Sequence, residues 1–247
     1  MLRKIKADLH IHSCLSPCGD IEMTPSAIVK KAKAIGLDAI GICDHNSSEN
    51  AAAARKEGEK INLKVFSGME VTSKEEVHIL ALFDDEKELY ELQKTVYENL
   101  TGVNDEDLFG YQMVVNEKDE ITELNSKLLI GATDLTIDRI VEIIHSLKGL
   151  AIASHVDRER FSLIGQLGFI PEGLELDGVE LSPAYMAENG NYNYPVSSGF
   201  TQVTFSDAHF LDDIGKTSTT FLIEDLTVSE IKKALGNKDG RSVLAYS

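Results

Sequence analysis

The chain has 247 residues, with 24 Lys and Arg against 41 Asp and Glu, which gives a formal net charge of −17 at pH 7. This length can bury a sizeable core, either as one α/β barrel or as two small domains. The 43% hydrophobic and 26% charged residues are typical of a soluble globular protein and exclude a largely disordered chain. The acidic balance disfavours binding to duplex nucleic acid or an anionic membrane, but a small phosphorylated substrate stays compatible if bound metal reverses the local field.

We expect neither a membrane span nor a secretion signal. No apolar stretch approaches the ~20 residues that a span needs, and the first ten residues lack an apolar core. Cys14, Cys18 and Cys43 form no Cys-x-x-Cys pair, which is typical of reduced thiols rather than of a disulfide framework. The sequence therefore predicts a cytoplasmic protein and leaves its oligomeric state open.

Strand and helix patterns alternate along the chain, which predicts βα units and a mainly parallel sheet. The predicted strands cover residues 4–10, 38–43, 64–70, 77–83, 150–155, 178–181, 202–205 and 219–223. The predicted helices cover residues 25–35, 51–60, 85–100, 137–147 and 228–235, the first of them starting with an N-cap at Thr24 and Pro25. We expect one barrel-like domain over residues 1–247, with an insertion or excursion around residues 104–128.

Histidines and carboxylates follow the predicted strands, at the edge where parallel α/β folds build their sites. His10 and His12 close the first strand, and side chains two residues apart share one face, so both imidazoles can bind one metal ion. Asp8 lies on the same face and could accept a hydrogen bond from a ligand imidazole. By itself, the His-x-His pattern fits two solvated histidines at least as well.

Two further strands end in ionisable residues. Asp44 and His45 follow a buried run, where they must be solvated, paired or metal-bound. Glu70 ends the next strand, and its two carboxylate oxygens could bridge two cations. The simpler explanations are a helix-entry turn capped by Asp44 and a surface glutamate.

The remaining candidates accompany later strands. His78 precedes one apolar strand and His155 closes another, whereas Asp207 and His209 repeat the two-residue spacing after the apolar segment QVTF. Nitrogen and oxygen donors in this mixture suit Zn²⁺, Mn²⁺ or Fe²⁺. A lone histidine beside a buried strand is more often structural, and we expect His145, in the middle of a predicted helix, to be a packing residue outside the site.

Taken together and in order, these motifs resemble the PHP family (polymerase and histidinol phosphatase), a group of metal-dependent phosphoesterases. The matching segments are DLHIHS from Asp8, ICDHN from Ile42, GMEVTS from Gly68, HILAL from His78, IASHVD from Ile152 and SDAH from Ser206. The resemblance implies an α/β fold, a distorted (β/α)7 TIM-like barrel, with two or three divalent metal ions (Zn, Mn or Fe) in its mouth.

The resemblance also implies the metal ligands. One ion would bind His10, His12, Glu70 and Asp207. A second would share Glu70 and bind His155, with His78 nearby. A third would bind His45, His209 and one residue of the loop that follows His12.

That loop departs from the family pattern. The family usually places Asp or His there, often within Ser-Asp-Gly, whereas this chain has SCLSPCGDIEMTP. We expect Asp20 to be the ligand because it offers a hard oxygen donor. Cys18 is the alternative, since a thiolate could bind zinc. A buried Cys18 and a turn capped by Asp20 would leave both residues outside the site.

The resemblance predicts a phosphoesterase that uses metal-activated water for in-line attack on phosphorus. The expected catalytic residues are His209, Asp207 and His45, and either histidine could protonate the leaving group. Arg158 could clamp a substrate phosphate, or it could be a surface arginine. The expected substrate is a nucleotide, a short single-stranded oligonucleotide, or a sugar or amino-alcohol phosphate.

Two other functions stay open. An amidohydrolase-type enzyme acting on C–N bonds also opens with His-x-His, although the order of the motifs fits it less well. A non-catalytic, metal-bound PHP module is the other, although degenerate copies lose ligands. We expect residues 104–128, 157–169 and 183–195 to shape the pocket. The last segment is rich in side chains that could stack on or hydrogen-bond a base or sugar, or form an exposed loop: Tyr185, Asn189, Asn191, Tyr192, Asn193 and Tyr194.

Overall fold

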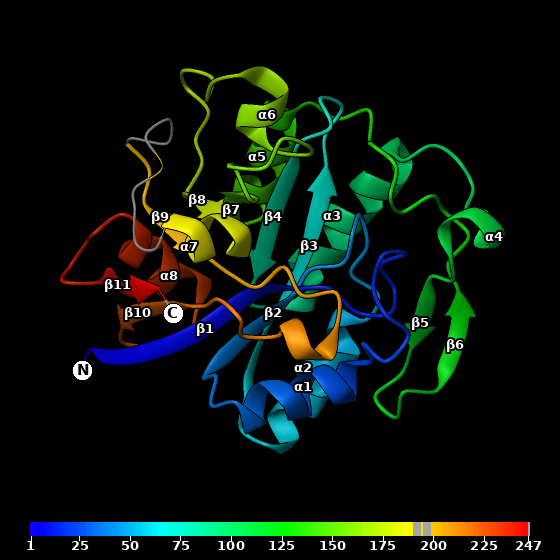
Figure 1. Cartoon of the computed structure of the whole chain (residues 1–247), viewed down its shortest axis with the longest axis horizontal. Helices are drawn as coiled ribbons and strands as arrows, with labels where there is room; N and C mark the ends of the chain where they lie inside the picture. Colours follow the sequence, from blue (N-terminus) through cyan, green and yellow to red (C-terminus); the bar gives the residue numbers. More distant parts are fainter. Residues whose placement is uncertain (190–193, 195–198, 247) are drawn as a thin grey trace.

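Short apolar strands alternate with helices in the structure, a computed structural model that describes residues 1–189, 194 and 199–246 (Figure 1). The strands of the central sheet are β1 (Arg3–Ile11), β2 (Ala39–Ile42), β3 (Lys64–Thr72), β4 (His78–Phe83), β7 (Leu150–Ala153), β8 (Gly178–Leu181), β9 (Gln202–Thr204), β10 (Thr219–Ile223) and β11 (Ser242–Tyr246). The helices around it are α1 (Pro25–Ala34), α2 (Ala51–Lys60), α3 (Glu86–Asn99), α5 (Ile137–Ser146), α6 (Leu163–Leu167), α7 (Pro183–Asn189) and α8 (Val228–Leu235).

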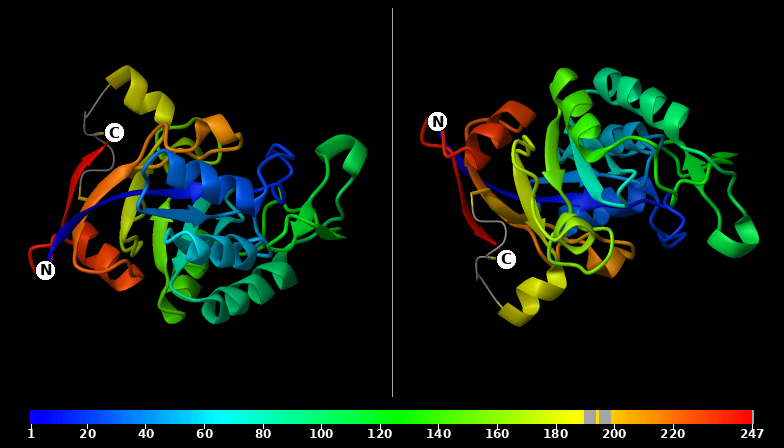
Figure 2. Two further views of the ribbon diagram at one scale, coloured as in Figure 1. Left: turned by 90° about the horizontal axis from the view of Figure 1, so that it is seen from below. Right: turned by 90° about the horizontal axis from the view of Figure 1, so that it is seen from above.

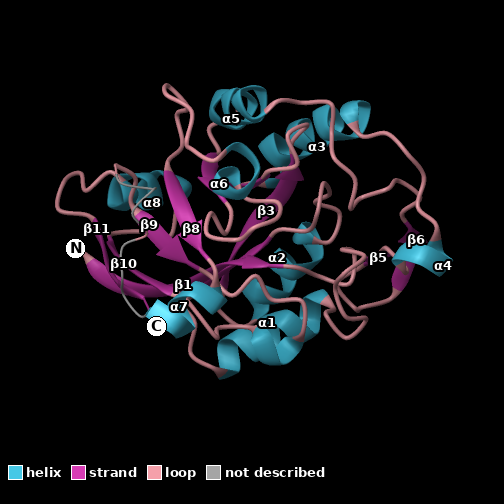
Figure 3. Ribbon diagram, turned by 45° about the horizontal axis from the view of Figure 1, so that its top comes forward, coloured by secondary structure: helices cyan, strands magenta, loops and turns pink. Residues whose placement is uncertain are grey.

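The central sheet has nine strands in the order β11-β10-β1-β2-β3-β4-β7-β8-β9, and it curls into a nearly closed barrel (Figure 3). Its two ends approach each other, because Tyr246 Oη donates to the carbonyl of Gln202 at 2.8 Å and the Thr204 N–H donates to Thr219 Oγ1 at 2.9 Å. Apolar side chains from the strands, among them Leu9, fill the interior. The predicted distorted barrel is therefore confirmed.

The prediction of a mainly parallel sheet is wrong, because β4 and β10 run against their neighbours. The described sheet has four parallel pairings (β1-β2, β2-β3, β7-β8, β8-β9) and four antiparallel ones (β3-β4, β4-β7, β1-β10, β10-β11). Only residues 73–77 separate β3 from β4, and so short a turn cannot carry the crossover that a parallel strand needs. As a consequence, the first residue of β4 lies at the same rim as the end of β3.

Local sequence signals explain where the helices begin. Thr24 caps α1 with its side-chain oxygen, which accepts from the Ala27 N–H at 3.4 Å, and Pro25 occupies the first turn. Gly36 follows the end of this helix with a φ of 80°, a conformation that glycine adopts without strain. The start of α1 therefore agrees with the sequence prediction.

The segment predicted as an excursion has secondary structure of its own. It contains α4 (Glu106–Phe109) and a two-stranded sheet of β5 (Met113–Val115) and β6 (Ile121–Leu124). It protrudes on the side of the molecule opposite the two termini (Figures 1 and 2). In the described part of the chain, no helix combines the length and apolar character that crossing a membrane requires.

Candidate metal centre

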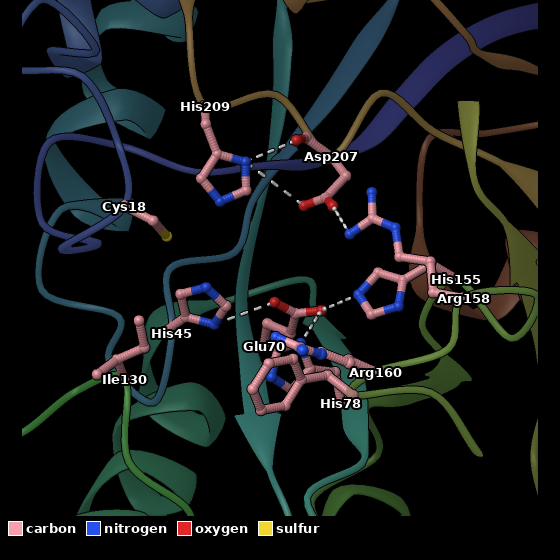
Figure 4. A pocket seen from close by; sticks show the side chains of 11 residues that line it. Cys18, His45, Glu70, His78, Ile130, His155, Arg158, Arg160, Asp207 and His209 are labelled. Atoms are coloured by element: carbon pink, nitrogen blue, oxygen red, sulfur yellow. Dashed lines mark hydrogen bonds and ion pairs between the residues drawn. The ribbon is translucent and has the colours of Figure 1, made fainter. Parts of the chain in front are cut away.

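Six of the seven histidines and two acids converge at one rim of the barrel, beside a cavity of about 330 Å³ (Figure 4). They come from the end of β1, the loop after β2, the ends of β3 and β4 that meet at this rim, and the loops after β7 and β9: His10, His12, His45, Glu70, His78, His155, Asp207 and His209. In the antiparallel register of β3 and β4, Thr72 pairs with His78. The reversal of β4 is therefore what brings His78 to the site.

Glu70 lies at the centre of this group. Its Oε1 is 3.1 Å from His78 Nδ1, 3.3 Å from His10 Nε2 and 3.4 Å from His155 Nε2. Its Oε2 is 3.1 Å from His45 Nδ1 and 3.5 Å from His12 Nε2. Both oxygens are buried and have no hydrogen-bond partner among the described residues. Because the two oxygens face different imidazoles, this carboxylate has the geometry to bridge two cations.

The hydrogen-bond network assigns the tautomers of His10 and His12. His10 Nδ1 donates a hydrogen bond to the carboxylate of Glu180, at 2.9 Å from Oε2. His12 Nδ1 donates to Ser16 Oγ at 2.9 Å, because that hydroxyl already donates to Asp44 Oδ1. The Nε2 atom of each imidazole is then directed at the cavity side. Burial opposes ionisation of His10, but the neighbouring carboxylates Glu180 and Glu70 hold its pKa well above the usual range.

The two Nε2 atoms lie only 3.2 Å apart, and Asp207 Oδ1 is 3.1 Å from that of His12 and 3.5 Å from that of His10. Ring nitrogens and carboxylates this close repel one another unless a positive charge, either a proton or a metal ion, lies between them. A divalent cation fits this donor set, since neutral imidazole and carboxylate are ligands of Zn²⁺ and Mn²⁺.

The electrostatics of the centre agree with this fit. Burial raises the pKa of Glu70, but His78 and His10 outweigh it and hold the pKa well below its usual range. Burial likewise opposes ionisation of Asp207, yet His10 and His12 keep its pKa low. Burial lowers the pKa of His12, and His209 and His45 lower it further, so this imidazole is neutral. The centre therefore presents anionic oxygens beside a neutral ring nitrogen.

Three overlapping groups of side chains bring their donor atoms within 4.8 Å of one another. They are His10, His12 and Glu70; His45, Glu70 and His78; and His12, His45 and His209. With Asp207, the first group has the residues that the PHP resemblance implies for one ion. The second group contains His45 where the resemblance implies His155, and the third contains His12 in addition to His45 and His209. His155 contacts the same centre, because its Nε2 lies 3.4 Å from Glu70 Oε1.

Two residues of the site have strained backbone. His155 has a φ of 30° and Asp207 a φ of 48°, in a region that non-glycine residues seldom adopt. Such strain costs about 1–3 kcal/mol per residue and is concentrated at functional sites. Both side chains point towards the cavity (Figure 4), so the strained turns position the side chains that face it.

Asp8 does not orient an imidazole, contrary to the interpretation of its position on β1. Its Oδ1 accepts from the Ser206 N–H and its Oδ2 from the Gly215 N–H, both at 2.9 Å, so it holds the loop after β9 in place. The acid that contacts a site imidazole is Glu180, which the sequence reasoning missed. The available signal was an acidic residue inside the otherwise apolar strand β8, where a carboxylate needs a partner.

Asp44 is buried and braces the loop after β1, so it is neither solvated nor a simple helix cap. Its Oδ1 accepts from the Ser13 N–H and from Ser16 Oγ, and its Oδ2 accepts from Ser13 Oγ, each at 2.7 Å. Through Ser16 it also steadies His12.

The structure separates the two candidates of the loop after His12. Asp20 Oδ1 accepts from the Glu22 N–H at 2.8 Å, and Asp20 is not among the described residues that line the cavity. Cys18 lines the cavity, with its sulfur facing His45 and His209 (Figure 4). Cys18 as a residue is exposed, but desolvation of its sulfur raises the pKa of the thiol. The charge of His45 and hydrogen bonds with His209 and His45 outweigh this effect and lower the pKa to about 6.

The loop after β7 supplies the other wall of the cavity. Arg158 Nη1 lies 2.7 Å from Asp207 Oδ2, and Phe161 stacks on His78 with ring centroids 4.9 Å apart. Arg160 also lines the cavity; the sequence reasoning singled out neither Arg160 nor Phe161. The expected contribution of residues 157–169 is thus confirmed.

The other two segments expected at the pocket are not seen there. The described lining residues include none from 104–128 or 183–195, although Ile130 follows the first of these segments. The start of the second segment is the helix α7 rather than a loop, and Asn191, Tyr192 and Asn193 lie outside the described residues.

His145 lies on α5, where its Nε2 pairs with Asp177 Oδ2 at 3.0 Å. All seven histidines belong to the described part of the chain, and His145 is the one that lies outside the centre, as the sequence predicted.

Comparison with known proteins agrees with this geometry. Residues 8–164 match the PHP domain, and the chain belongs to this family. A phosphoribosyl 1,2-cyclic phosphate 1,2-diphosphodiesterase from Eggerthella lenta is 31% identical over 80 residues, which cover 30% of this chain and 29% of that protein.

Solved structures share the fold. A lesion-specific endonuclease from Pyrococcus furiosus aligns with a TM-score of 0.69 and 21% identity, over 99% of this chain and 58% of the endonuclease. A related structure, at the same TM-score and identity, is an Endonuclease Q complex with a duplex substrate carrying an abasic lesion. A candidate metal-dependent phosphoesterase from Bifidobacterium adolescentis aligns with a TM-score of 0.54 and 18% identity, over 94% of this chain and 96% of that protein. This chain thus spans little more than half of the endonuclease.

Proposed function

We propose that this chain is a metal-dependent phosphoesterase that hydrolyses a small phosphorylated substrate with two or three divalent ions. The observation that carries the proposal is the set of buried donor atoms without partners at the barrel rim, above all both oxygens of Glu70. Family membership and the phosphodiesterase relative support the reaction class. Bound divalent metal supplies an activated water and neutralises charge on the phosphate oxygens.

The ligand roles follow the distances. His10, His12 and Asp207 would hold one ion together with Glu70. His155 and His78, which approach the same Glu70 oxygen as His10, would hold the second. His45 and His209 would contribute to a third position. The proposal includes Zn, Mn and Fe because all three accept imidazole and carboxylate donors.

When the third position holds no ion, His209 is the residue best placed to give a proton to the leaving group. Its side chain is 22% exposed, whereas those of His10 and His12 are fully buried, so it can exchange protons with water. Its Nδ1 donates to the Asp207 carbonyl at 2.8 Å, which leaves Nε2 for the substrate or a metal. His45 is the other candidate, but it lies deeper.

Arg158 would orient the substrate phosphate. Its side chain is 42% exposed at the cavity wall, and its contact with Asp207 aligns one edge of the guanidinium. The other donors stay available for phosphate oxygens, to which guanidinium binds bidentately. The cavity of about 330 Å³ fits a small phosphate ester, such as a nucleotide or sugar phosphate, or the end of a short single strand.

The test is an assay of phosphate release from phosphomonoesters, cyclic phosphodiesters and short oligonucleotides with Mn²⁺ or Zn²⁺. We expect turnover by the wild type and by His145→Ala, which removes an imidazole outside the centre. The variants His10→Ala and Asp207→Asn should lose metal and turnover together. The proposal would be refuted if the enzyme hydrolysed C–N bonds but no phosphate esters. It would also be refuted if the metal-loaded wild type released no phosphate from any of these substrates.

A further inference from the structure

The loop that carries Cys18 is held firmly beside the metal centre. The Gly19 N–H donates to the Ser16 carbonyl and the Asp20 N–H to the His209 carbonyl, both at 2.9 Å. A Cβ at Gly19 would lie 2.5 Å from the Ser13 carbonyl oxygen, so the turn after Cys18 requires glycine. The first bond closes the turn that contains Cys18, and the second ties the end of that turn to the segment that bears His209.

Cys18 lies beside a group of three histidine donors. Ring nitrogens of His12, His45 and His209 lie within 4.8 Å of one another, and Cys18 lines the same cavity as His45 and His209 (Figure 4). His45 is 7% exposed, and its Nδ1 has no hydrogen-bond partner among the described residues. This nitrogen faces Glu70 Oε2 at 3.1 Å without making a hydrogen bond, so a buried ring nitrogen of the group is open to a cation.

Asp20, the oxygen donor that the sequence favours, is engaged elsewhere. Its carboxylate accepts a hydrogen bond from the Glu22 N–H, and its backbone N–H donates to the His209 carbonyl. The loop therefore offers a sulfur atom to the cavity and keeps its carboxylate outside.

We propose that Cys18 completes the third metal position as a thiolate ligand, together with His45 and His209, and that this position prefers zinc. The inference rests on the metal centre of the proposed function. On binding, the thiol proton goes to solvent and the sulfur forms a bond to the metal, with no change of oxidation state. Thiolate donors favour Zn²⁺ over Mn²⁺, whereas an aspartate at this point would accept both.

The experiment titrates metal-free protein with Zn²⁺ and with Co²⁺ as a spectroscopic probe. The wild type should show a sulfur-to-cobalt charge-transfer absorption, and Cys18→Ser should lose it together with one zinc ion per chain. Cys14→Ser is the matched control, because Cys14 is buried against Asn50 Nδ2, 3.7 Å away, and lies outside the centre. Both Cys14→Ser and Asp20→Asn should keep the absorption and the zinc content.

A second variant covers the case in which Cys18→Ser folds poorly. Cys18→Asp should retain the metal but shift the competition between Zn²⁺ and Mn²⁺ towards Mn²⁺. A wild type without the absorption, or an Asp20→Asn variant that loses the zinc ion, would overturn the assignment of Cys18. Because these readouts need no substrate, a protein that shows them and hydrolyses no phosphate ester would contradict the proposed function alone.

Discussion

Glu180 and Ser16 lie behind the metal centre and fix which nitrogen of each histidine faces the cavity. Glu180 contacts His10 Nδ1, and Ser16 accepts from His12 Nδ1 while it donates to Asp44. Such contacts raise the basicity of a ligand imidazole and hold its ring. At the scale of single residues, the site therefore depends on side chains that touch no metal.

Replacing Glu180 by Gln should weaken metal binding by about 10–100-fold, the usual effect of losing a carboxylate behind a ligand histidine. The measurement is zinc affinity by competition with a chromophoric chelator. Glu172→Gln, an exposed acid on the preceding segment, is the control and should leave the affinity unchanged. Equal affinities in all three proteins would show that Glu180 has no positioning role.

At the scale of elements, the excursion supports the loop that follows β1. The Met113 N–H donates to the Cys14 carbonyl at 3.1 Å. Asn50, which precedes α2, bonds to Ser13 Oγ at 2.9 Å and to the Met113 carbonyl at 3.0 Å, and accepts from the Val115 N–H at 2.9 Å. One buried amide thus connects β5 to the metal-binding rim.

Asn50→Ala should lower the free energy of unfolding by about 3 kcal/mol, because each buried polar group left without a partner costs about 1–3 kcal/mol. Urea unfolding measures the loss, and hydrogen exchange at the Val115 amide should accelerate. The control is Asn99→Ala, whose side chain bonds only within α3 to the Thr95 carbonyl and should matter little. An unchanged Val115 exchange rate would argue against this connection.

Glu230 on α8 pairs with Arg241, the residue before β11, and this ion pair makes the stability of the fold depend on pH. Hydrogen bonds from Arg241 and Lys233 lower its pKa to about 2, from 4.5. Because the pKa of Glu230 is lower in the folded than in the unfolded chain, its ionised carboxylate stabilises the fold fully above pH 4.5. This stabilisation is lost as the pH falls towards 2. Glu230→Gln should therefore reduce the free energy of unfolding at pH 7 but much less at pH 3.

Urea unfolding at both pH values tests the Glu230 prediction. Glu59→Gln serves as the control, because Glu59 is exposed and its pairing with Arg55 at 3.5 Å adds little stability. An equal effect of Glu230→Gln at pH 7 and pH 3 would count against the ion pair.

The whole molecule is strongly acidic, with a net charge of −17, and this bears on nucleic-acid partners. We expect duplex DNA, with or without an abasic site, to bind more weakly than about 10⁻⁴ M at physiological salt, the weak limit of nonspecific binding. Fluorescence anisotropy with labelled duplexes and a labelled single strand measures this. Micromolar binding of the abasic duplex would instead favour a substrate like that of the structural neighbour.

Local patterns made many of the strands and helices predictable, because apolar periodicity and capping residues act within a few positions. The direction of β4 could not be predicted in this way, since it depends on how residues 73–77 turn. The sequence did not predict β11, because polar and apolar residues alternate only weakly along it. Among the described strands, it pairs only with β10.

The candidate site was likewise predictable where the signal is local and unpredictable where it depends on the tertiary fold. The histidines stand at strand ends and could be found from sequence, although their roles as ligands stay a prediction. The contact between His10 and Glu180 joins residues 170 positions apart, and no local sequence pattern predicts it. Likewise, the choice between Asp20 and Cys18 depends on a turn whose path is set by the close approach of Gly19 to Ser13.

The most direct test of the metal centre is a crystal structure of the protein grown with Mn²⁺ or Zn²⁺, with anomalous scattering recorded to locate the ions. We predict at least two ions flanking Glu70, one of them about 2.0–2.2 Å from His10 Nε2 and His12 Nε2, the distances of ordinary coordination. Anomalous maps without ions at this rim, with the imidazoles turned away from Glu70, would contradict the account.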